Sequence, residues 1–344
     1  MQALPTPLSN TQFEAALNAA EDADASPEER AEMLMEIAMG MQARPKSAQQ
    51  LTDAVSLYER ALEVAPPQAV LLKARIGARM GTALQALPTD GESNRGAAHL
   101  ERAQQCFERA IETLQVHGKP EEVAEAELNQ GLVMQALTGL GRGRITDAIS
   151  AYHRSLRTFS REAWPQEYAV LHNNLAIAYL SMPATDERGR MREALAVQSF
   201  EEVLKVINLI DHPSEYAMIN NNLGNALQYA SSGHVLENNL RALAAYDEAL
   251  RVRNPRDTPL EYANTIANKA NVLRNLTADP AQVSVGANDA TAGPPADPLI
   301  DALSLVREAR DLFERHGDGY KATLMRDTAA EIEAELAQRR QRMN

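Results

Sequence analysis

Hydrophobic and polar residues recur along the chain with a helical period. In several segments a small or large apolar residue returns at intervals of four and three positions, as in Ala54, Tyr58 and Ala61. Residues with this spacing lie on one face of an α-helix. Ala and Leu dominate the apolar residues, which favours helices, and runs of the β-branched residues typical of strands are rare. The pattern therefore predicts an all-α protein.

One helical segment occurs in six copies. The three clearest copies are residues 165–179, 213–227 and 259–273, where Pro is followed by Glu, then Tyr-Ala, and by Asn nine residues after the Pro. Another copy begins at Pro120, and weaker copies begin at Pro66 and Pro27. Pro suits the first turn of a helix because its missing N–H would have no partner there. Eleven residues after each Pro stands a small residue, and these are Ala38, Gly77, Gly131, Ala176, Gly224 and Ala270.

A second helix follows each copy and has its own pattern. A small residue is followed four positions later by a large apolar residue, and three positions after that by another small residue. We interpret the large residue as a knob held between flat patches of the paired helix. The six sets are Ala54, Tyr58, Ala61; Ala103, Phe107, Ala110; Ala148, Tyr152, Ser155; Ala196, Phe200, Val203; Ala242, Tyr246, Ala249; and Ala302, Val306, Ala309.

The order Asn-Leu-Gly/Ala, then Ala, Tyr/Phe, Ala resembles the tetratricopeptide repeat (TPR), and the PxEYAxxxNNLGNA wording resembles bacterial TPR arrays with lengthened repeats. The family's usual repeat has about 34 residues; these are longer. The resemblance covers residues 27–315. It implies a right-handed superhelical solenoid of about six helix pairs with capping helices, in which the first helix of each pair lines the inner wall.

The remaining segments complete the expected domain organisation. Residues 1–26 are expected to be an N-terminal capping segment with a short helix at 9–20, and residues 316–344 a C-terminal capping helix. Two stretches, 87–95 and 183–190, are polar and turn-rich and are expected to be exposed loops. Residues 278–297, within the last repeat, are expected to be disordered. This insertion is either dispensable or a lid over the inner face.

Composition excludes several functions. The net charge is −13, from 47 acidic and 34 basic residues, which disfavours nucleic-acid binding. Cys106 is the only cysteine, so no intramolecular disulfide is possible, and its apolar stripe favours a small core residue. Residues 1–10 lack the pattern of a signal peptide, and no segment has the roughly 20 apolar residues that span a bilayer. We expect a cytoplasmic protein that does not bind membranes.

Catalytic and metal-binding motifs are missing from the sequence. The seven His residues are scattered, with no metal-ligand spacing, so neither a metal nor a cofactor is expected. The glycine-rich stretch 139–143 lies between two helices rather than after a strand, which is the wrong context for a phosphate loop. Carboxylates lie mostly on polar helix faces. We therefore expect that the protein is not an enzyme.

The candidate site is a set of asparagines on the first helices. An amide both donates and accepts, so a row of amides can hold the backbone of an extended peptide. The alternative is that these amides bond neighbouring repeats. The family's lysine-rich clamp for a C-terminal carboxylate has no match here, and Arg75, assigned to the same column, is expected to form a surface ion pair. The candidate residues are Asn129, Asn174, Asn222, Asn268, Asn225, Asn271, Asn173, Asn221, Asn264 and His172.

The expected function is that of a non-catalytic scaffold or adaptor that binds a segment of another protein in its concave groove. The alternative is an accessory subunit or assembly factor of an enzyme complex, which uses its loops and convex face. Self-association is compatible with either function. TPR arrays bind many kinds of partner, so the resemblance does not identify the partner.

Overall fold

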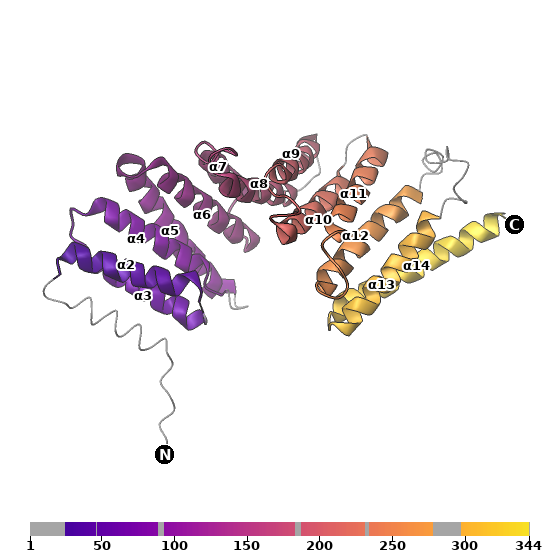
Figure 1. The fold of residues 1–344 in the computed structure, drawn as a ribbon, viewed down its shortest axis with the longest axis horizontal. Helices are drawn as coiled ribbons and strands as arrows, with labels where there is room; N and C mark the ends of the chain where they lie inside the picture. Colours follow the sequence, from indigo (N-terminus) through magenta and orange to yellow (C-terminus); the bar gives the residue numbers. More distant parts are fainter. Residues whose placement is uncertain are drawn as a thin grey trace, which may run out of the picture. The chain divides into compact units, whose positions relative to one another are not determined.

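The computed structural model describes residues 25–45, 47–88, 93–182, 187–230, 234–277 and 297–343. Within these ranges every regular element is an α-helix, so the all-α prediction is confirmed (Figure 1). The helices are α2 (Pro27–Ala43), α3 (Ala48–Val64), α4 (Val70–Gln85), α5 (Ser93–His117), α6 (Pro120–Gly139), α7 (Ile145–Ser155), α8 (Pro165–Leu180), α9 (Glu187–Leu204), α10 (Pro213–Tyr229), α11 (Val235–Leu250), α12 (Pro259–Thr277), α13 (Pro298–Arg315) and α14 (Gly319–Met343).

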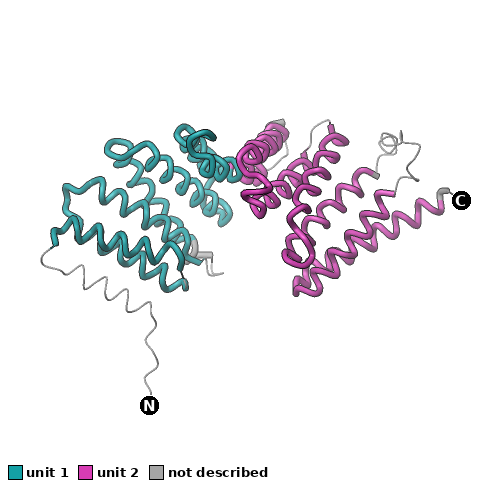
Figure 2. The backbone as a smooth tube through the Cα atoms, in the orientation of Figure 1, with its two compact units in different colours: residues 1–174 teal, residues 175–344 magenta. Residues whose placement is uncertain are grey.

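The chain forms two compact units, residues 1–174 and 175–344 (Figure 2). In the first unit α2 packs on α3, α4 on α5 and α6 on α7; in the second, α10 packs on α11 and α12 on α13. We number the repeats 1 to 6 in chain order; repeat 4 consists of α8, within which the boundary between the two units falls, and α9. Within a unit, the first helices of successive repeats also touch, as α4 touches α6 and α10 touches α12. Within each unit, these first helices therefore lie side by side.

The helix starts follow from local chemistry. Ser26 accepts a hydrogen bond from Glu29 N at 3.2 Å, and Glu29 accepts one from Ser26 N at 2.8 Å, which together form a capping box before α2. Five of the six first helices begin at the expected Pro. The exception is α4, which begins at Val70 rather than at Pro66.

This later start corrects the alignment of repeat 2. Counted from the first residue of its helix, the small position of α4 is Gly81, one helical turn after the predicted Gly77. A Cβ on Gly81 would lie 2.9 Å from the Phe107 ring, whereas a Cβ on Gly77 would meet only Cys106 O, at 3.9 Å. In this register, every repeat has a buried alanine seven residues before the small position. These alanines are Ala31, Ala74, Ala124, Ala169, Ala217 and Ala263.

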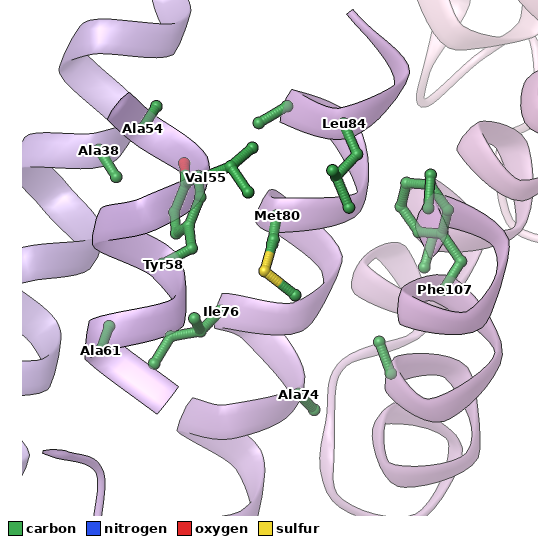
Figure 3. Packing of buried hydrophobic residues seen from close by; sticks show 14 of the residues in the cluster. Ala38, Ala54, Val55, Tyr58, Ala61, Ala74, Ile76, Met80, Leu84 and Phe107 are labelled. Carbon is green, nitrogen blue, oxygen red and sulfur yellow. The ribbon is translucent and has the colours of Figure 1, made fainter. Parts of the chain in front are cut away.

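Large side chains of the second helices form the core, as the spacing predicts. All six knob residues are almost completely buried. Figure 3 shows Tyr58 of α3 across from Ile76 and Met80 of α4, with Phe107 of α5 beyond Leu84. Small residues beneath the knobs permit this close approach, since interiors have the density of organic crystals. The six knobs are Tyr58, Phe107, Tyr152, Phe200, Tyr246 and Val306.

Several expectations concern the ends and loops. The helix predicted at 9–20 and most of the insertion predicted at 278–297 lie outside the described residues. Two predicted loops are partly wrong: α5 already begins at Ser93 and α9 at Glu187, because their polar residues form the first turns of amphipathic helices. Helix α14 packs on α13 and buries Ile332. That it caps the repeat array stays a prediction.

Candidate functional site

Five of the six candidate asparagines of the second unit lie on one face of two neighbouring helices, and the sixth, Asn221, is buried. In α10 and α12 the positions concerned are separated by four, three and four residues, which places them on one side of each helix. Most are amides. We call this surface the amide face, and its residues are Met218, Asn222, Asn225 and Tyr229 on α10 and Asn264, Asn268, Asn271 and Asn275 on α12.

Some of these amides are engaged within the protein. Asn225 accepts a hydrogen bond from the buried Tyr246 hydroxyl at 2.8 Å, so it also orients a core side chain. Asn264 donates to Leu260 O of its own helix at 2.7 Å. Asn268 donates to Asn221 of the preceding repeat at 3.4 Å. The alternative that amides bond neighbouring repeats is therefore correct for Asn268 and Asn221.

Other groups on the amide face remain available to a ligand. Asn222 and Asn271 are half-buried, and neither side chain has a hydrogen-bond partner among the described residues. Beside them Met218 is 41% exposed and Tyr229 is 69% exposed. A hollow of about 350 Å³ adjoins the end of α10, and Asn225 and Tyr229 line part of it. Open amides next to exposed apolar side chains suit a peptide, whose backbone is polar and whose side chains vary.

The corresponding face of the first unit is ionic. Arg75 Nε lies 2.7 Å from Glu122 Oε1, and Arg79 lies 2.8 Å from Glu125, so two ion pairs join α4 to α6. The ion pair expected for Arg75 is confirmed. In the corrected register, however, the residue of α4 that corresponds to the asparagines is Arg79. The guanidinium of Arg75 holds the pKa of Glu122 below its ordinary value.

Asn129 belongs to this ionic face. Its amide donates to Glu125 O at 2.9 Å, one turn earlier in α6, so its donor serves its own helix. Together with Arg75, Arg79 and Glu125 it lines a narrow cleft of about 50 Å³. The cleft is too small for more than a single side-chain group. Asn129 is thus less available to a peptide than Asn222.

Helix α8 carries the remaining candidates. The His172 ring lies against the Tyr168 ring one turn earlier in the same helix, with centroids 4.3 Å apart and the planes tilted by 48°. The Asn173 amide oxygen is buried and has no hydrogen-bond partner within the described part of the chain, while Asn174 is half-exposed. A buried acceptor without a donor costs free energy, and the burial of this oxygen keeps it out of reach of a ligand.

Sequence reasoning missed three members of the amide face. Met218 and Tyr229 were not predicted because a single apolar residue on a helix is usually part of a core, and Asn275 was not predicted because it lies beyond the repeated segment that ends at residue 273. A signal was nevertheless present, since these residues stand four positions before or after predicted asparagines. Their helix spacing alone was sufficient to include them.

Other chemistries find little support on the described surface. Among the described residues there is no group of three or more His, Cys, Asp or Glu side chains that could hold a metal ion. None of the helices in the described ranges is long and apolar enough to cross a bilayer. The strongest pKa changes are increases for Tyr58, Tyr152 and Tyr246, and burial of their hydroxyls in the core causes them. All three hydroxyls belong to knob residues of the core.

Comparisons with known proteins identify no family. No protein-family model matches the chain, and no curated protein matches it. Among solved structures it is similar to BtubC (BKLC) from P. vanneervenii, with 19% identity over 74% of this chain and 97% of that one, and a TM-score of 0.47. A Rap protein complexed with competence and sporulation factor has 11% identity, coverages of 98% and 89%, and a TM-score of 0.37.

A third structure is a circular tandem repeat protein, with 16% identity, coverages of 96% and 71%, and a TM-score of 0.23. All three TM-scores lie below 0.5, so these similarities carry no functional argument. The helical-repeat fold rests instead on the helix pairs of the chain itself.

Proposed function

We propose that this protein is a non-catalytic interaction scaffold of the TPR-like type, which binds an extended segment of another polypeptide on the amide face. The observation that carries the proposal is the pair of open amides, Asn222 and Asn271, beside the exposed Met218 and Tyr229. Two facing helices present these groups in rows. Such amides pair with peptide groups whatever the side chains are, so the proposed site favours an extended backbone over a particular sequence.

The remaining asparagines have two roles in this proposal. Asn225, Asn268 and Asn221 hold the two helices and the Tyr246 hydroxyl in place through their own hydrogen bonds. Asn222 and Asn271 contact the ligand directly. A rigid platform loses little conformational entropy on binding, which strengthens association.

Peptides selected from a phage-displayed random library on the full-length protein test this proposal. Their affinity is then measured by fluorescence anisotropy for wild type and for the double variant Asn222→Ala, Asn271→Ala. Two lost hydrogen bonds of about 1 kcal/mol each predict binding weaker by about tenfold or more. Gln198→Ala removes an exposed amide from α9, a second helix, and is expected to bind as wild type does.

Thermal denaturation of the variants controls for folding, since Asn→Ala on a helix surface is expected to preserve or raise stability. If all selected peptides bind the double variant as tightly as wild type, the amide face is not the site.

The second candidate function is that of an accessory subunit or assembly factor that uses its loops. Two exposed apolar side chains favour it: Val116, at the end of α5, is 73% exposed, and Ile210, in the connection between α9 and α10, is 88% exposed. Val116→Ser and Ile210→Ser are expected to leave peptide binding unchanged under the first proposal. If these two changes abolish capture of a partner that the amide-face variant still captures, the loop surface is the functional one.

A further inference from the structure

A second hollow lies in the first unit, between α3, α4 and α5, and has a volume of about 440 Å³. Its lining includes Lys73 and Gly77 of α4, and Cys106 and Arg109 of α5. Apolar residues such as Val70 and Leu62 complete the wall. Among the residues that the structure describes, no carboxylate lines this hollow, although the chain has a net charge of −13. We call it the repeat-2 hollow.

The repeat-2 hollow exists because a side chain is missing. Four residues before the small position, repeats 1 and 6 bury Leu34 and Ile266, and repeats 3 and 5 bury Glu127 and Asn220. Repeat 2 has Gly77 at this position. A Cβ there would meet only Cys106 O, at 3.9 Å, so the space in front of the backbone is open.

Repeat 3 shows what fills the same place. Two residues after its knob, Arg154 Nε lies 2.9 Å from Glu127 Oε1, and this carboxylate is 5% exposed. Arg109 is also two residues after its knob, and Gly77 replaces Glu127. Repeat 2 therefore has the cation of this pair but not the carboxylate.

Lys73 adds a second positive charge. In repeats 5 and 6 the residues corresponding to Lys73 are Tyr216 and Tyr262, whose hydroxyls donate to Glu248 and Glu308 at 2.7 and 3.1 Å. Repeat 2 replaces each Tyr–Glu pair with a Lys and an Arg.

Neither Lys73 nor Arg109 forms an ion pair with any residue that the structure describes. Arg102, also on the lining, is paired with Glu59. Lys73 is half-buried and Arg109 is exposed, and both line the hollow, so an anion from outside can meet two positive charges there. An apolar wall with a few convergent polar groups is typical of ligand sites.

We infer that the repeat-2 hollow binds a carboxylate on a short apolar stem, supplied by a Glu or Asp side chain of an interacting polypeptide. The carboxylate takes the place that Glu127 has in repeat 3, between Arg109 and Lys73. The polypeptide source rests on the proposed scaffold function. The charge argument does not, because it compares repeats of the same chain.

A carboxylate built into the chain tests the charge argument without a partner. Gly77→Glu and Gly77→Gln add nearly the same volume and remove the same helix penalty of glycine. Gly77→Glu is expected to raise the thermal midpoint by about 2–4 °C over Gly77→Gln at pH 7. The advantage is expected to vanish when Arg109→Gln and Lys73→Gln are added. Equal midpoints of the two Gly77 variants would overturn the inference.

Cys106 provides a reporter of occupancy, since it is the only cysteine and lines the hollow. Its reaction with the neutral reagent 4,4′-dithiodipyridine is followed by absorbance with added hexaglutamate, with hexaserine as control. Hexaglutamate is expected to slow the reaction at least threefold in wild type, and less in Gly77→Gln, whose side chain fills the same space. It is expected to have no effect in Gly77→Glu or in the Lys73→Gln, Arg109→Gln variant. Absence of protection in wild type would contradict the inference.

Glutarate, at the same carboxylate concentration, separates the sources of the anion. If glutarate protects Cys106 as well as hexaglutamate does, the hollow is a site for small carboxylates and the polypeptide assignment is wrong. The amide-face variant Asn222→Ala, Asn271→Ala is expected to retain the protection. Failure of the amide face and failure of the repeat-2 hollow are thus distinguishable.

Discussion

The ring of Tyr152 lies so close to Gly131 that a Cβ added to the glycine would be 2.5 Å from it. The Tyr152 hydroxyl donates to Gln135, one turn further along the same first helix, at 2.8 Å. Two contacts therefore position the knob of repeat 3: its ring lies against Gly131, which has no side chain, and its hydroxyl is hydrogen-bonded to Gln135. Tyr246 has the same relationship to Gly224 and Gln228 in repeat 5.

Gly131→Ala is expected to destabilise the protein, because real Cβ atoms do not approach a ring to 2.5 Å and the helices must separate. Overpacking of this kind typically costs about 1–3 kcal/mol. Gly40→Ala is the matched control, since a Cβ on Gly40 meets nothing within 4 Å. It is expected to stabilise helix α2 by about 0.5–1 kcal/mol. Urea denaturation measures both changes, and equal signs would contradict the prediction.

Phe107→Tyr is expected to stabilise repeat 2. Gln85 occupies the position of Gln135, yet its amide oxygen is buried without a hydrogen-bond partner in the described structure, because the knob is Phe107. A tyrosine hydroxyl supplies the missing donor, with an expected gain of about 1 kcal/mol in the free energy of unfolding. The reverse change Tyr152→Phe leaves Gln135 unsatisfied and is expected to cost a similar amount. A loss of stability in Phe107→Tyr would show that the hydroxyl does not fit.

Arg75→Met is expected to change the acid side of the stability profile. The hydrogen bond from Arg75 is the main reason that the pKa of Glu122 lies below its ordinary value of 4.5. A carboxyl whose pKa is lowered by folding stabilises the protein above its unfolded pKa, and this contribution is lost as pH falls through the folded pKa. The stability difference between wild type and Arg75→Met is therefore expected to be largest near pH 7 and to shrink below about pH 4.5. A pH-independent difference would assign the effect to packing alone.

Arg154→Met leaves the buried Glu127 without its cation and is expected to destabilise repeat 3 by about 3 kcal/mol. The double variant Glu127→Leu, Arg154→Met is expected to recover most of this loss. Leu34 and Ile266 show that the position of Glu127 accepts an apolar side chain in other repeats. A double-mutant cycle by urea denaturation measures the coupling. If the double variant is as unstable as Arg154→Met, the ion pair is not the reason for the loss.

Local patterns were sufficient to predict the helix pairs. The Pro at each start and the four-and-three spacing around Tyr58 or Tyr246 act within one or two turns of helix, so they can be read from adjacent residues. Most of the core follows from them, because the face that carries the knob is the face that is buried. Five of the six first helices begin where the prolines predict.

The register of repeat 2 could be assigned only from the tertiary structure. Gly77 and Gly81 are one turn apart on the same helix, so both match the small position in sequence. The Phe107 ring distinguishes them, because it comes from a different helix and touches only Gly81. The wrong register aligned Arg75 with the asparagines of the other repeats. It also hid the open space next to Gly77.

For the candidate asparagines too, the sequence determined one part of the site and the tertiary structure another. Their repeated spacing was enough to place Asn222 and Asn271 on a common side of the first helices. Which amides are already occupied depends on partners one helix away, such as Tyr246 for Asn225, or a full repeat away, such as Asn221 for Asn268. Helix periodicity is a property of neighbouring residues, whereas hydrogen bonds and ion pairs between repeats depend on how whole helices stack, and only the folded chain reveals that.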